Sequence, residues 1–387
     1  MVKKPHLCTR QPMNILVIPT TDWVRHPVPN RLNFIFDAMA IRHKVFVLHF
    51  PLKQFRDNTP RSTSCTLMKS GPVPVSDPSL FYLLNFPFHF LAIRKLVRKE
   101  QIDAILSANI LPSFLANGTG VPIVFDYLDH LEESASVYYP DSMAGSLIQK
   151  GVRVITRYNL RHSKAVITVT NELKEYLSGI RIKNVSVIPN GVDTALLRPE
   201  NKEEAKKRLG FEGKYVLGYA GSLEYWVDLE TAVEALPQLP GILLLIVGPG
   251  LFTDYGTFIA GRAKELGVED RVIFTGAVPY REIGKYISSM DMGLNPLKPM
   301  KKNEYAAGGK VFNYLACGRP VLSSRMISLE RLLGDDLFYY DDVNSFVNQV
   351  KQILILGKKE EYYRAIAIKF DWNTLAQQYE SVLMDAI

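Results

Sequence analysis

Residues 305–321 read YAAGGKVFNYLACGRPV, a stretch that passes from a loop of small residues into a short helix and then into a buried strand over Pro320–Ser323. Lys310 lies where the helix should begin, and Gly318 lies where glycine commonly ends one. The helix dipole disfavours a cation at that end. Two interpretations of Lys310 are open, a solvated side chain or a ligand for a phosphate group, and we favour the phosphate ligand.

Apolar runs rich in valine and isoleucine alternate with amphipathic stretches on both sides of this segment. Such runs are typical of strands covered on both faces of a parallel sheet. The alternation occurs twice, which predicts an α/β protein with two doubly wound, Rossmann-like domains. The expected strands are Asn14–Ile18, Val45–Phe50, Ala104–Ser107, Pro122–Asp126, Ala165–Thr170, Val185–Pro189, Tyr215–Ala220, Ile242–Val247, Val272–Thr275, Met292–Leu297, Pro320–Ser323 and Leu337–Tyr340. The expected helices include Asp228–Leu236, Phe258–Leu266, Tyr280–Ser289 and Phe346–Leu356.

A turn-prone segment beginning at Pro189 separates the two series of strands. We therefore expect an N-terminal domain over residues 1–189 and a C-terminal domain over residues 190–371. The last stretch, residues 372–387, is amphipathic and has no strand after it. We expect it to form a helix that packs back on the first domain.

The composition is that of a globular protein, with 387 residues, 47% hydrophobic and 22% charged. The net charge of +7 favours anionic partners such as nucleotide phosphates or a phospholipid surface. No helix-turn-helix or other nucleic-acid module is present, so nucleic acid is not an expected partner.

The three cysteines, Cys8, Cys65 and Cys317, are far apart, which indicates neither a zinc site nor a disulfide framework and fits a reducing cytosol. The first apolar run, Ile15–Ile18, is too short for a signal sequence, and no apolar stretch is long enough to span a bilayer. We expect a cytoplasmic protein that is soluble or peripheral on the inner face of the membrane.

Ligands of open parallel sheets bind at the carboxyl ends of the strands, and with two such domains the natural site is the cleft between them. Glycine at the end of a strand lets a backbone approach a ligand closely, as expected for the loop Gly218–Leu223. The turn Phe274–Pro279 is placed to present backbone groups to a planar base. Residues Val247–Gly250 do not continue as GxGxxG and predict a turn.

In the first domain, the sequence Asp126-Tyr127-Leu128-Asp129-His130 ends a buried strand and should point into the cleft. A carboxylate beside an imidazole can take a proton from an acceptor hydroxyl or orient a bound sugar. The alternative is a capping aspartate with a surface histidine. We favour a functional role, with Asp129 rather than Asp126 as the reacting carboxylate and His130 beside it.

The segment Leu80–Lys99 is rich in aromatic residues and then basic. Aromatic residues with cationic neighbours suit docking on an anionic bilayer surface. A core helix with a solvated basic end is at least as good an interpretation of most of its apolar residues. Pro87 should interrupt any helix in this segment.

The segment Gly309–Val321 resembles the donor-site signature of the family-four (group 1) glycosyltransferases, which have the GT-B fold. Order and spacing agree with that family from about Asn14 to the C-terminus, although the first domain is similar only in outline. Four further segments are similar to the family pattern, namely Val187–Asp193, Tyr219–Leu223, Arg271–Gly276 and Met292–Leu297.

The resemblance implies a nucleotide-diphosphate sugar donor bound mainly by the second domain, an acceptor bound by the first, and closure of the cleft between them. The family usually requires no metal, no convincing DxD motif is present, and we expect neither a metal nor a cofactor. The pair at residues 341–342 is better explained as turn chemistry. The residues expected to bind the donor are Gly221, Ser222, Val278, Tyr305, Gly309, Lys310 and Asn313.

The sequence departs from the family pattern at four positions. The family commonly has two glutamates separated by seven residues, which here fall on Tyr305, with Glu304 one residue away, and on Asn313. Asn313 can still bond ribose hydroxyls, and Glu304 could reach the sugar if the loop is shifted. The family's two diphosphate-binding cations fall on Ser222 and Val227, which leaves Lys310 as the expected diphosphate ligand.

We therefore expect a glycosyltransferase that acts on a lipid-linked or polysaccharide acceptor at a membrane surface. Retention of the anomeric configuration is implied by resemblance alone, and an inverting mechanism with Asp129 as base stays open. Two alternatives also stay open, a nucleotide-sugar epimerase of the same architecture and a non-catalytic nucleotide-sugar-binding partner of a transferase complex.

Overall fold

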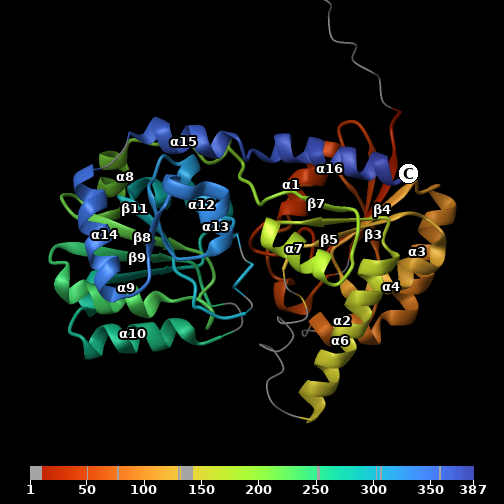
Figure 1. Cartoon of the computed structure of the whole chain (residues 1–387), viewed down its shortest axis with the longest axis horizontal. Helices are drawn as coiled ribbons and strands as arrows, with labels where there is room; N and C mark the ends of the chain where they lie inside the picture. Colours follow the sequence, from red (N-terminus) through yellow and green to blue (C-terminus); the bar gives the residue numbers. More distant parts are fainter. Residues whose placement is uncertain are drawn as a thin grey trace, which may run out of the picture.

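Two parallel sheets, of seven and six strands, lie side by side along the long axis of the molecule (Figure 1). They come from a computed structural model that describes residues 11–49, 51–75, 78–129, 131, 143–250, 253–301, 303–305, 307–356 and 359–387. Helices cover both faces of each sheet. This arrangement confirms the predicted pair of doubly wound α/β domains.

The first sheet has the order β3-β2-β1-β4-β5-β6-β7, and all of its pairs are parallel. Strand order reverses between β1 and β4, so the crevice for a ligand opens there. Its strands are β1 (Asn14–Ile18), β2 (Lys44–His49), β3 (Thr66–Lys69), β4 (Ala104–Ser107), β5 (Ile123–Tyr127), β6 (Ala165–Thr168) and β7 (Val185–Val187). Its helices are α1 (Arg31–Met39), α2 (Pro78–Leu84), α3 (Phe86–Lys99), α4 (Ile110–Ala116), α6 (Met143–His162) and α7 (Asn171–Gly179).

The second sheet has the order β10-β9-β8-β11-β12-β13 and reverses between β8 and β11. Its strands are β8 (Tyr215–Ala220), β9 (Ile242–Val247), β10 (Val272–Gly276), β11 (Met292–Asn295), β12 (Val321–Ser324) and β13 (Phe338–Tyr340). Its helices are α8 (Lys202–Leu209), α9 (Leu229–Ala235), α10 (Tyr255–Glu265), α11 (Ile283–Ser289), α12 (Lys310–Ala316), α13 (Ile327–Leu333), α14 (Val343–Leu356) and α15 (Glu360–Ile368).

The twelve expected strands are all present, with bounds that are unchanged or shifted by one or two residues. The sequence analysis missed the edge strand β3. Of the helices that it named as examples, Asp228–Leu236, Phe258–Leu266 and Phe346–Leu356 correspond to α9, α10 and α14. The stretch expected as one helix over Tyr280–Ser289 is a 3-10 turn, Tyr280–Glu282, followed by α11. The expected interruption near Pro87 lies at Asn85, between α2 and α3, because Pro87 occupies the first turn of α3, where proline is tolerated.

The last helix, α16 (Trp372–Ala386), lies over the first domain (Figure 1). Its buried residues recur every three or four positions and join the core formed by α1, β1 and β4. Trp372 stacks on Phe34 of α1 with ring centroids 5.5 Å apart. The hydroxyl of Tyr379 donates a hydrogen bond to Asp126 of β5 at 2.8 Å. The predicted domain boundaries lie between residues 189 and 190 and between residues 371 and 372. Residues on the two sides of each boundary are in contact, and both boundaries stay predictions.

Among the described residues, no helix is both long and apolar enough to cross a membrane.

Candidate active site

The carboxyl end of β8 meets the start of α12 in the second domain. A Cβ atom built on Gly221 would lie 3.2 Å from Cε of Lys310 and 3.0 Å from the hydroxyl oxygen of Tyr219. Gly248, which follows β9, has a φ of +128°, and a Cβ there would lie 2.2 Å from the carbonyl oxygen of Gly221. Glycine is therefore needed at both positions for the two loops and the lysine to pack together.

Lys310 is a partly buried cation at this junction. Its Nζ lies 5.1 Å from the centre of the Tyr219 ring, a cation–π contact. Within the described ranges, Lys310 forms no ion pair, and burial lowers its pKa to about 8. A charged amine held away from water without an opposite charge is unfavourable. The site can therefore gain free energy by accepting an anionic group beside Lys310.

Two buried tyrosines that the sequence analysis did not single out fix this geometry. The hydroxyl of Tyr314 on α12 accepts a hydrogen bond from the backbone N–H of Ala220 at 2.7 Å. The hydroxyl of Tyr219 donates to the carbonyl of Ser222 at 2.6 Å. The bond from Ala220 to Tyr314 holds α12 against the end of β8. In the sequence, only the presence of an aromatic residue beside each segment of small residues hinted at these bonds.

The other expected donor residues lie around this junction. Asn313 follows Lys310 by one helical turn and is half-buried, as is Ser222. Gly309 precedes α12 with helical dihedrals, and a Cβ built there would meet no atom within 4 Å, so the space beside it is open. Val278 follows β10, whose last residue, Gly276, accepts a hydrogen bond from the backbone of Gly248 at 3.0 Å.

Asn295, at the end of β11, is a buried polar residue under the loop that precedes α12. Its Nδ2 donates to the Ser323 hydroxyl at 2.9 Å. Its Oδ1 would lie 3.2 Å from a Cβ on Gly308, and no hydrogen bond to that oxygen is present in the described parts of the chain. Asn295 thus fixes the floor of the loop, a role that the sequence analysis did not assign.

Glu304 and Tyr305 lie in the loop that reaches toward the first domain. Glu304 is exposed. The carbonyl of Tyr305 accepts a hydrogen bond from the Thr170 hydroxyl at 3.2 Å, and its ring lies 5.8 Å from that of Tyr176 on α7. The loop therefore bridges the two domains.

Three further sets of contacts lie between or beside the two domains. Arg331 of α13 pairs with Glu172 at 3.0 Å and with Glu175 at 3.2 Å, both on α7. Asn190 accepts a hydrogen bond from Arg31 at 3.2 Å and donates one to the carbonyl of Ala307 at 2.8 Å. The rings of Phe34 and Tyr280 lie 5.9 Å apart. The structure therefore has the two domains in contact.

In the first domain, Asp126 and Asp129 have different surroundings. Asp126 is buried, lies 3.8 Å from Nε of Arg31 and accepts the hydrogen bond from Tyr379. Burial raises the pKa of Asp126, and the arginine and the hydrogen bond oppose that rise. Asp129 is half-buried in the turn after β5, and its carbonyl accepts a hydrogen bond from Leu131 at 2.8 Å. His130 lies outside the described residues.

Asp126 thus anchors α16, which leaves Asp129 as the candidate carboxylate for proton transfer. In the described part of the chain, no group of three or more His, Cys, Asp or Glu side chains is arranged to hold a metal ion. The assigned roles of the site residues, and the expectation that no metal is needed, stay predictions.

Two family models together match most of the chain. Residues 37–196 match Glycosyltransferase Family 4, and residues 214–355 match Glycosyl transferases group 1. The chain belongs to the family 4/group 1 glycosyltransferases. This family assignment confirms the resemblance drawn from the Gly309–Val321 segment.

Curated proteins are similar to this chain over part of their length. The putative teichuronic acid biosynthesis glycosyltransferase TuaH of Bacillus subtilis is 27% identical over 202 residues, 51% of this chain and 50% of that protein. The alpha-monoglucosyldiacylglycerol synthase of Streptococcus pneumoniae is 24% identical over 268 residues, 64% of this chain and 58% of that protein. The matched region thus spans about half the length of these curated relatives.

Solved structures extend the likeness to the whole fold. Sucrose-phosphate synthase from Thermosynechococcus elongatus superposes with a TM-score of 0.76 at 18% identity, covering 97% of this chain and 99% of that one. HepE of Anabaena in complex with UDP-glucose gives a TM-score of 0.71 at 18% identity, covering 96% and 100%. With the two facing parallel sheets, these matches confirm the GT-B architecture.

Proposed function

We propose that this family 4/group 1 chain transfers a sugar from a nucleotide-diphosphate donor, held mainly by the second domain, to a lipid-linked or glycan acceptor held by the first. The observation that carries the proposal is Lys310, a partly buried cation with no ion pair in the described residues. It lies at the carboxyl end of the sheet, against a glycine loop. A diphosphate would supply the missing opposite charge.

The neighbouring side chains suit the rest of such a donor. Asn313 offers an amide to ribose hydroxyls, and Val278 lies in the turn that would face the base. Gly221 keeps its loop against Lys310, with Ser222 next to it, and the open space beside Gly309 leaves room for backbone contact with the phosphates. Glu304 and Tyr305 are on the bridging loop, where the sugar would meet the first domain. We assign them to the sugar, with Lys310 at the diphosphate.

We assign Asp129, with His130, to the acceptor side. A half-buried carboxylate in the turn after β5 can accept the proton of an acceptor hydroxyl or hold the donor sugar. Retention of the anomeric configuration is the family-based proposal, and an inverting reaction would instead use Asp129 as general base. Analysis of the product anomer distinguishes the two mechanisms.

The acceptor proposal draws on the relatives and on α3. The named relatives include an alpha-monoglucosyldiacylglycerol synthase and a putative teichuronic acid biosynthesis glycosyltransferase, whose names point to a lipid and to a glycan. On α3, Phe88 and Leu91 are exposed beside a groove of about 660 Å³ lined by Phe90, Leu91, Arg94, Lys95, Arg98 and Lys99. This combination suits a peripheral protein on an anionic membrane surface.

The direct test is transfer or hydrolysis of nucleotide sugars by the purified protein. UDP-glucose is the first donor to try, because HepE was solved with it. The Lys310→Ala variant should lose roughly tenfold or more in donor affinity. The matched control is Lys285→Ala, which removes an exposed lysine from α11 that lies 3.8 Å from Glu282.

Two outcomes would replace this proposal. Conversion of the donor to an isomer without any acceptor would indicate an epimerase. Donor binding by calorimetry without turnover on any acceptor would indicate a non-catalytic partner of a transferase complex, which the absent family cations at Ser222 and Val227 favour. Unchanged donor affinity in Lys310→Ala would remove that residue from the diphosphate site.

A further inference from the structure

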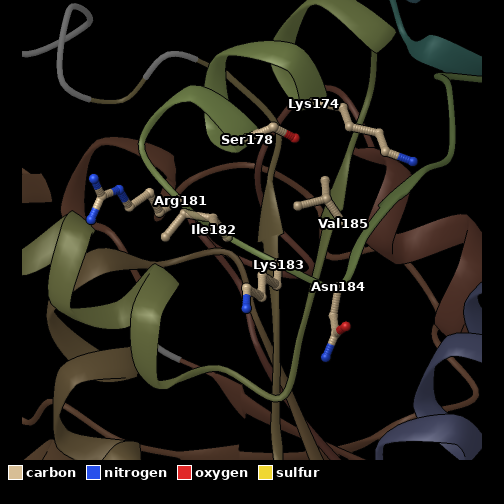
Figure 2. Close-up of a pocket in the computed structure, with 7 residues that line it drawn as sticks. All are labelled: Lys174, Ser178, Arg181, Ile182, Lys183, Asn184 and Val185. Carbon is tan, nitrogen blue, oxygen red and sulfur yellow. The ribbon is translucent and has the colours of Figure 1, made fainter.

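An open pocket of about 620 Å³ lies between α7 and the start of β7, at the edge of the first sheet (Figure 2). None of the residues assigned above to the donor or to proton transfer lines it. We call it the α7–β7 pocket. Its lining residues are Lys174, Ser178, Arg181, Ile182, Lys183, Asn184 and Val185.

Three exposed cations, Lys174, Arg181 and Lys183, give this pocket a strong positive charge. None of the three forms an ion pair within the described ranges. The acidic residues of α7, Glu172 and Glu175, both pair with Arg331 of the second domain. The positive charge of the pocket is therefore not balanced by the acids on the same helix.

The backbone at Arg181 adds an independent observation. Its φ is +65°, and the N–H of the next residue, Ile182, bonds to the carbonyl of Leu177 at 2.9 Å, which closes the end of α7. This position of a helix end usually holds glycine, because a side chain is disfavoured in the left-handed conformation. Arg181 instead places a long cationic side chain at this position, at the helix end where the dipole favours positive charge, and that side chain lines the pocket.

The spacing of the cations indicates the shape of the ligand. Arg181 and Lys174 extend to opposite sides of the pocket, with Lys183 between them (Figure 2). They do not converge on one point, so an extended chain of anionic groups fits better than a single phosphate. Ser178 and Asn184 offer hydroxyl and amide groups to the same ligand.

The lining residues also indicate which class of polyanion fits the pocket. It contains no aromatic side chain on which a nucleobase could stack. Ile182 is buried and Val185 is half-buried, so no large apolar side chain is presented to a bilayer. A hydrophilic chain that carries carboxylates or phosphates is the ligand that remains.

We propose that the α7–β7 pocket binds an acidic polysaccharide segment of the acceptor. The inference rests on the proposed function for its link to an acceptor, while the pocket itself predicts polyanion binding. Another face of α7 contacts the second domain through Tyr176 and Glu175. One helix therefore connects the pocket with the edge of the cleft, and a long acceptor could occupy both.

The test is calorimetric binding of an oligogalacturonate of defined length to the full chain at low ionic strength. The triple variant Lys174→Gln/Arg181→Gln/Lys183→Gln should bind it roughly tenfold more weakly, since each exposed charge contact contributes modestly. A maltooligosaccharide of the same length, which is neutral, should not bind at the pocket. The matched control, Lys264→Gln/Lys351→Gln/Lys369→Gln, removes three exposed lysines of the second domain and should retain binding.

The variant Arg181→Gly tests whether a loss of binding comes from the missing charge rather than from misfolding. It should weaken oligogalacturonate binding while leaving the melting temperature unchanged or higher, because glycine suits the left-handed backbone. The proposal is overturned by equal binding to wild type and the pocket triple variant, by an equal loss in the triple lysine control of the second domain, or by equal binding of the neutral oligomer. Loss of binding to phosphatidylglycerol vesicles alone in the pocket triple variant would also overturn it, in favour of a membrane contact.

UDP binding and sugar transfer are measured on the same samples. If wild type neither binds UDP nor transfers sugar while the pocket triple variant still loses oligogalacturonate binding, the proposed function fails and the polyanion site stands. If UDP binds and sugar is transferred but the oligogalacturonate does not bind, the further inference fails alone.

Discussion

At the scale of single residues, the position of Lys310 suits ligand binding but lowers the stability of the ligand-free protein. Burial lowers its pKa below that of an exposed lysine. The folded pKa therefore lies below the unfolded one, so the charged amine destabilises the native state at neutral pH. That penalty fades as the pH rises from about 8 toward the unfolded value of about 10.4. A bound diphosphate would also reduce this destabilisation, because it would place negative charge beside the protonated amine.

The first prediction concerns pH. If only the protonated amine binds the diphosphate, UDP affinity should fall about tenfold between pH 7 and pH 9, because the pKa of Lys310 is about 8. Calorimetric titration of UDP at the two pH values measures this. In the control variant Lys310→Met, affinity should be low and nearly independent of pH, and melting should occur at a higher temperature at pH 7. A flat pH profile in wild type would contradict the diphosphate role.

A second residue-scale prediction concerns the Asp126 anchor. Burial raises the pKa of Asp126, so ionising this carboxylate as the pH rises costs native-state stability, and the Tyr379 hydroxyl reduces that cost. Tyr379→Phe should lower the free energy of unfolding by about 1–3 kcal/mol at pH 7 and by less at acid pH, where the carboxyl is protonated.

Urea unfolding at two pH values measures this difference. Tyr340→Phe is the matched control, because the buried hydroxyl of Tyr340 has no hydrogen-bond partner among the described residues. An equal effect of the two variants would show that the Asp126 contact contributes nothing specific.

At the scale of elements, α3 presents both apolar and basic side chains to solvent. Exposed fractions are 44% for Phe88 and 63% for Leu91. The double variant Phe88→Ser/Leu91→Ser should weaken binding to phosphatidylglycerol vesicles by roughly tenfold or more, since each side chain would bury apolar area in the bilayer. Sedimentation with vesicles measures it.

The control for α3 is Ile355→Ser on α14 of the second domain, where the isoleucine is 82% exposed. It should leave vesicle binding unchanged. If the control and the α3 variant sediment alike, α3 is a solvated helix, as the alternative interpretation of its sequence holds.

Elements buried on both faces were the ones that the sequence predicted well. Runs such as Ile242–Val247 are apolar throughout, because helices cover both sides of the sheet. The edge strand β3 escaped prediction because it is short and begins and ends with exposed residues.

The candidate site was predictable as far as topology goes. Strand ends on one edge of a sheet must lie close together, which placed Gly221 near Lys310 from the sequence alone. The ring of Tyr219 beside the lysine, and the bond from Ala220 to Tyr314, depend on side-chain packing between distant segments. Periodicity carries no information about such contacts.

At the scale of the whole molecule, the ion pairs of Arg331 with two glutamates of α7 add to the other contacts that join the two domains. Arg331→Ala removes the pair with the exposed Glu175, worth about 0.2–1 kcal/mol, and the pair with Glu172, whose side chain is buried. It should shift the ligand-free protein toward an open form, with a larger radius of gyration by small-angle X-ray scattering.

Arg325→Ala is the control, because Arg325 pairs with Glu330 and Asp341 inside the second domain. It removes the same charge without touching the first domain. Equal radii for wild type and both variants would mean that these pairs do not restrain the domains.

The crossing of α16 onto the first domain has a consequence for the order of synthesis. A ribosome makes the whole second sheet before it makes Trp372 and Tyr379, which complete the core around Phe36 of the first domain. During that interval the nascent first domain exposes apolar surface, and Asp126 lacks its hydroxyl partner. Nascent chains halted before Trp372 should therefore depend on chaperones, even though every strand of both sheets has already been translated.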